Sequence, residues 1–367
     1  MSDKIQYYDS NDYDDGFYVK DARKRAVRTS STKTPQPEQK AKKSLFGRFI
    51  RSFLVIIAIM LILAGIYITL VLSRINYTNE VPDHTLAEET GSLKSENNIE
   101  NIMIFGEDNH KENEHGRADT MILLTIDKVH NQLKQTSFMR DIYLYIPGHE
   151  YNKLNASYVY GGAKLTVETI EYNFGIKIDN YIIVDFNSFT DIVNSLGGID
   201  LELSREEIEY INMQSYRNHQ TQSEQELDPD SFSYYYNEKE EQVAKVHLNG
   251  RQALWYARDR DSIGVDFDRT QRQRIVVNTV FDKFRSSDPF STMYAVYNAS
   301  PYLTTNMSPS DLTLKGFELI RALDYERCEH RLPSTDNYYD VWNDSGLALQ
   351  IADEDLQKQR LYDFIFQ

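Results

Sequence analysis

The chain has 367 residues, of which 26% are charged and 41% hydrophobic, and its formal net charge is −16. This length allows two or three domains. The acidic balance argues against a protein that binds nucleic acid or anionic membranes through its general field. The single cysteine, Cys328, is atypical of a secreted animal protein of this size and compatible with a Gram-positive envelope protein.

The N-terminal part of the chain predicts a tail followed by a membrane span. Residues 1–48 are polar and lack the apolar period of a folded unit, so we expect a disordered tail. Residues 49–73 contain an uncharged run, 53–72, that as a helix would cross the ~30 Å core of a bilayer. A cleaved signal peptide is the alternative, but the run is too long, starts too late and has no small-residue cleavage site. We therefore predict one transmembrane helix.

Basic residues predict the orientation of this helix. Residues 1–52 carry 12 of the 40 Lys and Arg residues and 7 of the 56 Asp and Glu residues. After the apolar run only Arg74 is basic before Lys94. The positive-inside rule then places the N-terminus in the cytoplasm and residues 75–367, with a net charge of −22, outside the cell. The polar residues 74–98 are expected to form an extracellular stalk.

Residues 99–285 are expected to form a folded core. The apolar runs 102–105, 121–126 and 181–184 are short and continuous, as in strands buried on both faces. Helical stripes lie between and after them, one ending at Gly175 and one at Gly197. Strands that alternate with helices indicate an α/β layered domain.

Two later segments differ from this pattern. Residues 213–243 are polar and Tyr-rich and are expected to be a long surface excursion. Residues 286–367 are expected to be the C-terminal helical part of the same ectodomain. One of its helices should begin at Ser308 and Pro309, a good N-cap followed by proline in the first turn.

One predicted helix has a core-facing stripe whose first positions are polar and whose later positions are apolar. Val277, Val280 and Phe281 follow the spacing of a core-facing stripe. One turn earlier the same face carries Gln273, and one turn before that Arg269. A buried unpaired arginine costs several kcal/mol, so we expect an anionic group at the mouth of this core.

Further arginines lie close in the sequence. Arg258 and Arg260 precede the stripe, and forked donors that converge on one place suit phosphate oxygens. The ligand that this pattern predicts is phosphate-like. Arg272 and Arg274 lie off the stripe and are expected to be solvated.

Two carboxylates could lie at one edge of the sheet. Asp108 follows the run 102–105, and Asp119 precedes the run that starts at Met121, so adjacent antiparallel strands would bring both together. Such a pair could hold Mg²⁺ (or Mn²⁺), which accepts one or two carboxylates plus phosphate oxygens. Alternatively, Asp108 caps a turn and Asp119 pairs with Arg117. The spacing favours neither.

Arg140 ends a third predicted strand near the same edge. Alone it would be read as a surface ion pair with Asp141, but the other arginines favour a shared phosphate site. Lys153 precedes a short predicted helix, 156–160. The sequence has no motif of a serine hydrolase, zinc peptidase or P-loop enzyme. It therefore favours metal and arginines acting on a phosphate ester by charge neutralisation and positioning.

These pieces, in this order behind one apolar span, resemble the LytR-CpsA-Psr family of bacterial cell-envelope proteins. The resemblance is carried by residues 101–108 (NIMIFGED), 117–121, 139–143, 146–148, 153–158, 161–162, 184–186, 196–200, 248–260 and 266–273. The tail from Tyr338 is similar to the staphylococcal methicillin-resistance regulator (MsrR-like) branch.

The resemblance implies a central mixed β-sheet flanked by helices, with a hydrophobic tunnel that binds a lipid. It also implies an extracellular phosphotransferase. Family members move a glycopolymer, such as wall teichoic acid or capsule, from undecaprenyl pyrophosphate to the muramic acid 6-hydroxyl of peptidoglycan. Asp108 and Asp119 would bind Mg²⁺ or help to deprotonate the hydroxyl. The pyrophosphate would be held by Arg117, Arg140, Lys153, Arg258, Arg260, Arg269 and Gln273, with Arg117 and Arg140 also counted as catalytic.

Three positions depart from the family pattern. His110 stands where arginine is frequent, Met139 where proline is usual, and Asp268 where glycine precedes Arg269. Asp268 would place an acid beside the phosphate site.

Two other functions remain open. One is a non-enzymatic, membrane-bound regulator (transcriptional attenuator) of envelope genes, although residues 1–45 lack helix-turn-helix periodicity. The other is a pyrophosphatase on the same lipid-linked donor, with water replacing the sugar hydroxyl.

Overall fold

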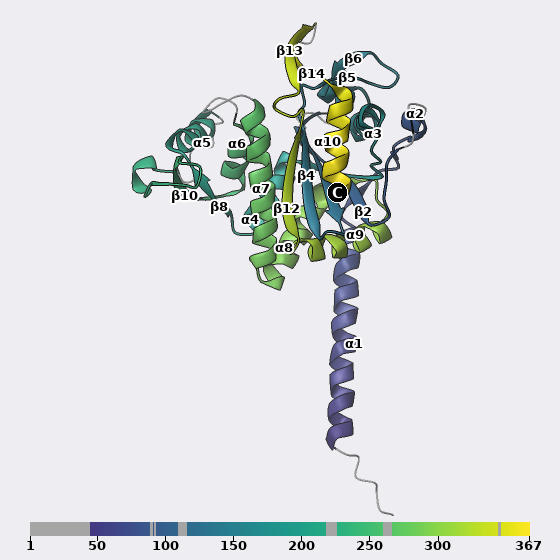
Figure 1. Cartoon of the computed structure of the whole chain (residues 1–367). Coiled ribbons are helices and arrows are strands. Elements are labelled where there is room, and N and C mark those ends of the chain that lie inside the picture. The colour runs from purple at the N-terminus through teal and green to yellow at the C-terminus, as the bar shows by residue number, and fades with distance from the viewer. Residues whose placement is uncertain are drawn as a thin grey trace, which may run out of the picture. The chain divides into compact units, whose positions relative to one another are not determined.

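A computed structural model describes the chain over residues 45–88, 91, 93–108, 116–217, 226–259, 266–343 and 346–367. The chain divides into two units, Met1–Ala58 and Ile59–Gln367. Helix α1 (Leu45–Leu72) begins in the first unit and ends in the second. Its part Arg48–Leu72 is long and apolar enough to span a membrane, as the sequence predicts for residues 49–73. Figure 1 shows the elements of the whole chain.

The second unit is built on a mixed β-sheet, which confirms the predicted α/β class. Seven of the described strands pair in the order β1-β11-β7-β2-β3-β4-β12. The pairs β1–β11, β2–β7 and β4–β12 are parallel, and the other neighbours are antiparallel. In sheet order the strands are Asn76–Tyr77, Leu303–Thr305, Asn180–Asp185, Ile99–Asp108, Arg117–Asp127, Gln132–Phe138 and Glu326–Leu332.

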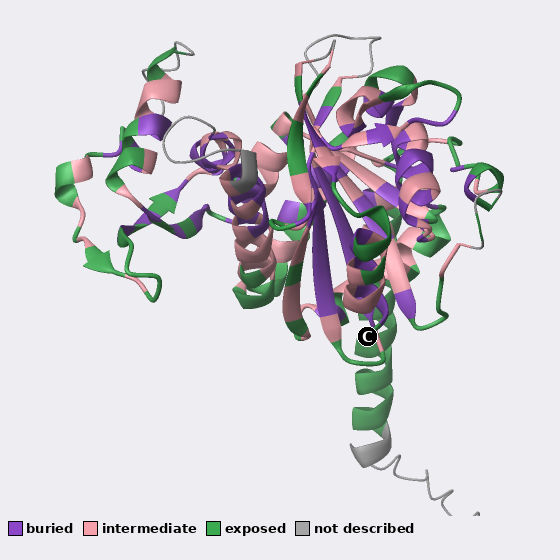
Figure 2. Ribbon diagram, turned by 45° about the horizontal axis from the view of Figure 1, so that its top comes forward, coloured by how far each residue is buried: buried purple, intermediate pink, exposed green. Residues whose placement is uncertain are grey.

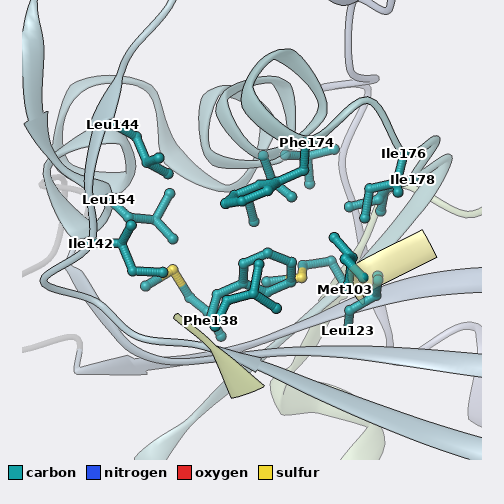
Figure 3. Close-up of a cluster of buried hydrophobic side chains, with 14 of the residues drawn as sticks. Met103, Leu123, Phe138, Ile142, Leu144, Leu154, Phe174, Ile176 and Ile178 are labelled. Atoms are coloured by element: carbon teal, nitrogen blue, oxygen red, sulfur yellow. The ribbon is translucent and has the colours of Figure 1, made fainter. Parts of the chain in front are cut away.

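One face of this sheet is closed by α3 (Leu154–Phe174) and α10 (Glu354–Phe366). Side chains alternate along a strand, so Phe105 of β2 and Leu123 of β3 point into this core. Phe138 and Phe174 meet there, with ring centroids 5.7 Å apart. Figure 3 shows the packed cluster, and Figure 2 shows how thoroughly the central strands are buried. We call this cluster, which also holds Met103, Met121, Leu154, Val167, Ile170 and Ile178, the closed core.

The opposite face carries the alternate side chains of the same strands. Ile102 and Leu124 pack beneath α9 (Pro309–Ala322), together with Met307. Further along this face lie helices α4 (Phe186–Ser195), α6 (Gly250–Arg258) and α7 (Asp266–Ser286). The apolar runs 102–105 and 121–126 are thus strands with both faces largely buried, as predicted, whereas in β7 only Tyr181 is buried and residues 182–184 are half-buried.

A smaller sheet extends from α6 and α7. It has the order β8-β10-β9, with strands Ile199–Leu203, Gln242–Leu248 and Tyr235–Tyr236. Helix α5 (Arg205–Arg217) and a short 3-10 helix (Pro229–Ser231) complete it. The predicted surface excursion therefore has structure in its described part, because Leu227 and Tyr234 belong to the second apolar core.

Two expectations about the flanks of the domain differ from the structure. The described residues of the segment 74–98 pack on the domain rather than forming a stalk: β1 joins the sheet, Tyr181 Oη donates to the Glu80 carbonyl at 2.9 Å, and helix α2 (Thr85–Glu88) follows. Their polar composition conceals this packing, because most of these contacts are made by main-chain groups.

Residues 286–367 are helical only in part. They hold α8 (Pro289–Ala299), a 3-10 helix (Ser300–Tyr302), α9 and α10, but also β11, β12 and a hairpin. That hairpin, β13–β14, spans Tyr338–Asn343 and Gly346–Ile351. A second hairpin, β5–β6, lies earlier in the chain and spans Tyr143–Tyr145 and Tyr151–Lys153. Strand β12 has the sequence ERCEHRL and lies at the edge of the sheet. An edge strand need not carry an apolar run, so no pattern in the sequence indicated this strand.

Candidate active site

An apolar cavity lies between the central sheet and helices α4, α6 and α7. Ile104 and Ile122 line it from the sheet, and Val277, Val280 and Phe281 line it from α7. Among the described residues around it, the polar side chains are Asp119, Thr120, Asp185, Arg258, Arg269 and Gln273.

The topology gathers these polar residues at one end of the cavity. Strands β2 and β7 are parallel and end there, whereas β3 is antiparallel and begins there. Helix α6 ends with Arg258, and Arg269 stands in the first turns of α7. The site is therefore an apolar hollow with a charged mouth, as the stripe on α7 predicts.

Arg269 and Gln273 are buried, as their places on the stripe require. Their exposed fractions are 2% and 7%, and Val276 follows at 2%. Arg269 Nη2 donates to the main-chain carbonyl of Asp119 at 3.3 Å. A guanidinium is thus held inside the wall of the cavity, where phosphate oxygens would meet it away from bulk water.

A β-bulge shapes the floor of the mouth. Gly106 pairs with Thr120 and Glu107 with Ala118, so Asp119 is the extra residue of β3. A bulge re-aims the residue at which it occurs, and Asp119 lines the cavity. Gly106 permits the close approach of the two strands, because a Cβ there would lie 2.8 Å from Cβ of Thr120.

Asp108 and Asp119 come to the same sheet edge from adjacent antiparallel strands, as predicted. Asp108 Oδ2 accepts from Arg258 Nη2 at 3.0 Å, and Asp119 Oδ1 accepts from Arg140 Nη1 at 2.8 Å. The guanidinium of Arg258 also lies 4.3 Å from the ring centroid of Phe186, a cation–π contact that orients it.

Arg140 belongs to a network rather than to an isolated surface pair. Its Nε donates to Asp141 Oδ2 at 3.2 Å, while Lys153 Nζ lies 3.0 Å from Asp141 Oδ1. Asp141 therefore holds two cations side by side, and Arg140 connects them to Asp119. Lys153, at the end of β6, is placed near the mouth through this shared carboxylate.

Glu107 fixes the backbone beside Asp108. Its Oε1 accepts from the Gly116 N–H at 2.9 Å. On its other side lies the buried hydroxyl of Tyr158. Burial, and after it the charge of Glu107, raises the pKa of Tyr158, so this phenol stays a neutral donor at neutral pH.

The remaining predicted residues are less central. Arg117 is exposed at the start of β3. Arg260 and His110 lie outside the described residues.

The expectation that Arg272 and Arg274 are solvated is wrong. Arg272 Nη2 donates to the Asp259 carbonyl at 3.1 Å, and Arg274 Nε donates to Glu329 at 2.8 Å. Both are buried because α7 is covered on several sides, by α5, α6 and β12 as well as by the central sheet.

Asp268 does not line the cavity between the central sheet and α7. It lines a separate cleft formed by α5, the smaller sheet and the outer side of α7. One residue along a helix turns the side chain by roughly 100°, so Arg269 and Asp268 serve different surfaces. The glycine-to-acid departure from the family pattern therefore leaves the mouth of the cavity unchanged in charge.

The sequence patterns did not identify three residues that the structure places in or beside the site. Asp185 lines the mouth and caps α4 by accepting from Ser188 N at 2.7 Å. Phe186 stacks on Arg258, and Asp141 bridges Arg140 and Lys153. The position of Asp185 directly after a buried strand was a usable signal.

Comparisons with known proteins agree with this architecture. The sequence model of the LytR-CpsA-Psr family matches residues 68–356. TagV of Bacillus subtilis, a polyisoprenyl-teichoic acid–peptidoglycan teichoic acid transferase, is 32% identical over 213 residues; these are 56% of this chain and 49% of TagV. The regulatory protein MsrR of Staphylococcus aureus (strain Mu50) is 27% identical over 282 residues, which cover 75% of this chain and 76% of MsrR.

A solved structure with a bound ligand is also similar. TagT bound to LIIa-WTA superposes with a TM-score of 0.57 at 25% identity, over 73% of this chain and 91% of TagT. The fold thus has counterparts in wall-polymer proteins, while the match to TagV spans about half the length of that protein.

Proposed function

Because the chain belongs to the LytR-CpsA-Psr family, we propose that it transfers a glycopolymer from a polyprenyl pyrophosphate carrier to the cell wall. In its most specific form, the donor is an anionic glycopolymer of wall teichoic acid or capsule type on undecaprenyl pyrophosphate. The acceptor is then the muramic acid 6-hydroxyl of peptidoglycan, outside the cell. TagV, named as a teichoic acid transferase, and TagT, solved with LIIa-WTA, support this class of reaction.

The observation that carries the proposal is the combination of cavity and mouth. A polyprenyl pyrophosphate has a long apolar tail and a compact dianionic to trianionic head. The cavity offers an apolar interior along α7 and two arginines, Arg258 and Arg269, at one end. A soluble phosphate ester would need the arginines without the hollow, and a neutral lipid would need the hollow without the arginines.

The reaction needs charge stabilisation more than covalent chemistry. The acceptor hydroxyl oxygen bonds to the phosphorus that carries the glycopolymer. The bond from that phosphorus to the bridging oxygen breaks, and the lipid leaves as a polyprenyl monophosphate. Arg258, Arg269 and Arg140 would stabilise the charge that grows on the phosphate oxygens. Asp119, at the bulge, or Asp108 would help to remove the hydroxyl proton.

Asp108 and Asp119 would also hold Mg²⁺ or Mn²⁺. Within the described part of the chain, no group of three or more His, Cys, Asp or Glu side chains could hold a metal ion. Two carboxylates fit a Mg²⁺ ion that is completed by phosphate oxygens and water, rather than a cage made by protein alone. Such an ion would supply charge neutralisation at the diphosphate. Arg140 and Arg258, which pair with these carboxylates here, would then be available to phosphate oxygens.

The proposal is tested with full-length protein in lipid vesicles, supplied with a polyprenyl-pyrophosphate-linked glycopolymer, Mg²⁺ and peptidoglycan fragments. Arg269→Ala should lower transfer about 10²–10³-fold, as loss of one charge-stabilising donor does elsewhere. Arg269→Lys should recover part of it, because the charge returns without the fork. Arg285→Ala, on the exposed end of the same helix, is the matched control and should transfer normally.

Wild-type transfer by folded Arg269→Ala would contradict the proposal. Release of glycopolymer phosphate that does not depend on the acceptor would identify a pyrophosphatase instead. Full transfer by a chain lacking residues 1–44 would argue against a regulator that acts through its tail.

A further inference from the structure

Helices α8 and α9 expose apolar side chains. On α8, Phe290 and Tyr294 lie one turn apart, and on α9, Leu314, Phe317 and Ile320 follow one another at helical spacing. Their exposed fractions run from 59% to 83%. We call these five residues the α8/α9 apolar face.

This arrangement is the reverse of an ordinary surface helix. The inner side of α9 packs on the sheet through Leu312, Leu319 and Ala322, so α9 is apolar on both sides. A surface helix normally turns polar residues outward, and contiguous exposed apolar patches mark interaction sites. These exposed apolar side chains therefore mark a candidate interaction surface.

Helix α8, which carries part of the α8/α9 apolar face, contacts the end of the predicted membrane span. Tyr67 Oη, near the end of α1, donates to the Met293 carbonyl of α8 at 2.8 Å. Arg74 Nη1 donates to Tyr297 Oη at 2.9 Å, and its guanidinium lies 4.1 Å from the centroid of that ring.

The contact continues toward α9. Strand β1 pairs with β11, which connects α8 to α9 in the sequence. Figure 1 shows both helices at the same end of the central sheet. The last turns of α1 and the residue Arg74 that follows them thus contact α8.

We propose that α8 and α9 dock on the bilayer itself, as a second membrane contact beside the single span. The apolar face enters the boundary between headgroups and acyl chains, and Tyr294 and Tyr297 lie at the interface, where amphipathic rings are favoured. The driving force is apolar burial rather than attraction to anionic lipid, because residues 75–367 carry a net charge of −22.

Docking would bring the apolar part of the cavity close to the bilayer. Helix α7 runs from Arg269 at the mouth to Val280 and Phe281, and α8 begins three residues after α7 ends. A lipid tail could then pass from the membrane to the cavity over a short apolar path. This consequence alone rests on the proposed function; the docking does not.

Site-directed fluorescence tests the docking on the full-length protein. Cys328 is replaced by serine, and one cysteine is introduced by Phe290→Cys or Phe317→Cys and labelled with a polarity-sensitive dye. The matched control is Leu356→Cys, an exposed apolar position on α10. The protein is reconstituted in phosphatidylcholine vesicles that contain nitroxide-labelled lipids.

The labels at positions 290 and 317 should emit at shorter wavelength than the label at 356, and iodide in solution should quench them less. Nitroxides near the headgroup should quench them more than nitroxides at the chain end, because interfacial helices lie about 5–10 Å deep. Equal iodide access at 317 and 356, without nitroxide quenching, would overturn the proposal. Nitroxide quenching that appears only with anionic lipid would also overturn it. Protection from iodide accompanied by energy transfer between labelled copies would overturn it as well, because it would identify a second copy of the chain as the partner.

Discussion

The two faces of the central sheet are built from the same strands, but one face is a packed core and the other borders a cavity. Phe105 and Leu123 point into the closed core under α3 and α10, where Phe138 and Phe174 fill the space. Their neighbours Ile104 and Ile122 point the other way and line an open cavity under α4, α6 and α7.

The difference lies in the helices rather than in the strands. Helix α3 presents Val167, Ile170 and Phe174, which are fully packed. Helix α7 presents Arg269 and Gln273 and then Val277 and Val280, and all four line the cavity. The closed face thus stabilises the fold, while the open face keeps a hollow at some cost in packing. Variants on the two faces should therefore separate stability from activity.

The largest effect is expected on the closed face. Phe174→Ala removes a buried ring against Phe138 and should lower the free energy of unfolding by about 3–5 kcal/mol. Val277→Ala on the cavity wall should cost only about 1 kcal/mol, since its neighbours already border a void. Urea unfolding of both variants measures the contrast, and equal losses would show that the two faces are packed alike.

A pH effect should come from the rim of the closed face. Glu171 is buried there, accepts from the Ile178 N–H at 2.7 Å, and lies 2.9 Å from His84 Nδ1 of the segment before β2. Burial raises the pKa of Glu171 from 4.5 to about 7. A carboxyl whose pKa is higher in the folded state favours folding while it is protonated, and this contribution is lost as pH rises from about 4.5 through 7.

Replacing Glu171 by an isosteric amide tests this sign. At about 1.4 kcal/mol per pKa unit, the wild-type loss of unfolding free energy is at most about 3.5 kcal/mol. Glu171→Gln should flatten the dependence of unfolding free energy on pH across this window and should unfold less easily than wild type above pH about 7. A variant with the unchanged wild-type pH profile would show that Glu171 does not titrate between these limits.

A smaller effect on stability, but a clear one on function, should follow from filling the cavity. Val277→Trp places a ring in existing space and should change the unfolding free energy by less than about 1 kcal/mol. The same change at Val167 in the closed core should cost about 1–3 kcal/mol or more. Transfer by Val277→Trp should fall about tenfold or more, because the lipid tail loses its place. Unchanged transfer would mean that the tail binds elsewhere.

Sequence patterns predicted the elements whose burial is complete. The runs at 102–105 and 121–126 are apolar because both faces of β2 and β3 are covered, and Arg269 and Gln273 stood out because their stripe is otherwise apolar. The placement of Asp108 and Asp119 at one edge of the sheet followed from strand direction alone. Main-chain pairing of residues 74–98 and the edge strand β12 had no such signature, since neither needs an apolar run.

The partners of the site residues were beyond sequence reasoning for a different reason. Arg140 pairs with Asp119, twenty-one residues away, and Arg258 pairs with Asp108, which is 150 residues away. Such pairs depend on how α6 and the β5–β6 hairpin dock on the sheet. The bulge that turns Asp119 into the cavity likewise arises from strand register rather than from residue type.

The central claim is that the hollow and the arginines bind one ligand. A crystal structure of the full-length protein with added polyprenyl pyrophosphate tests it most directly. The account predicts the tail between Ile104, Ile122 and Val280, with diphosphate oxygens within hydrogen-bond distance of Arg258 and Arg269. A lipid bound on another surface, with this cavity empty at saturating lipid, would contradict it.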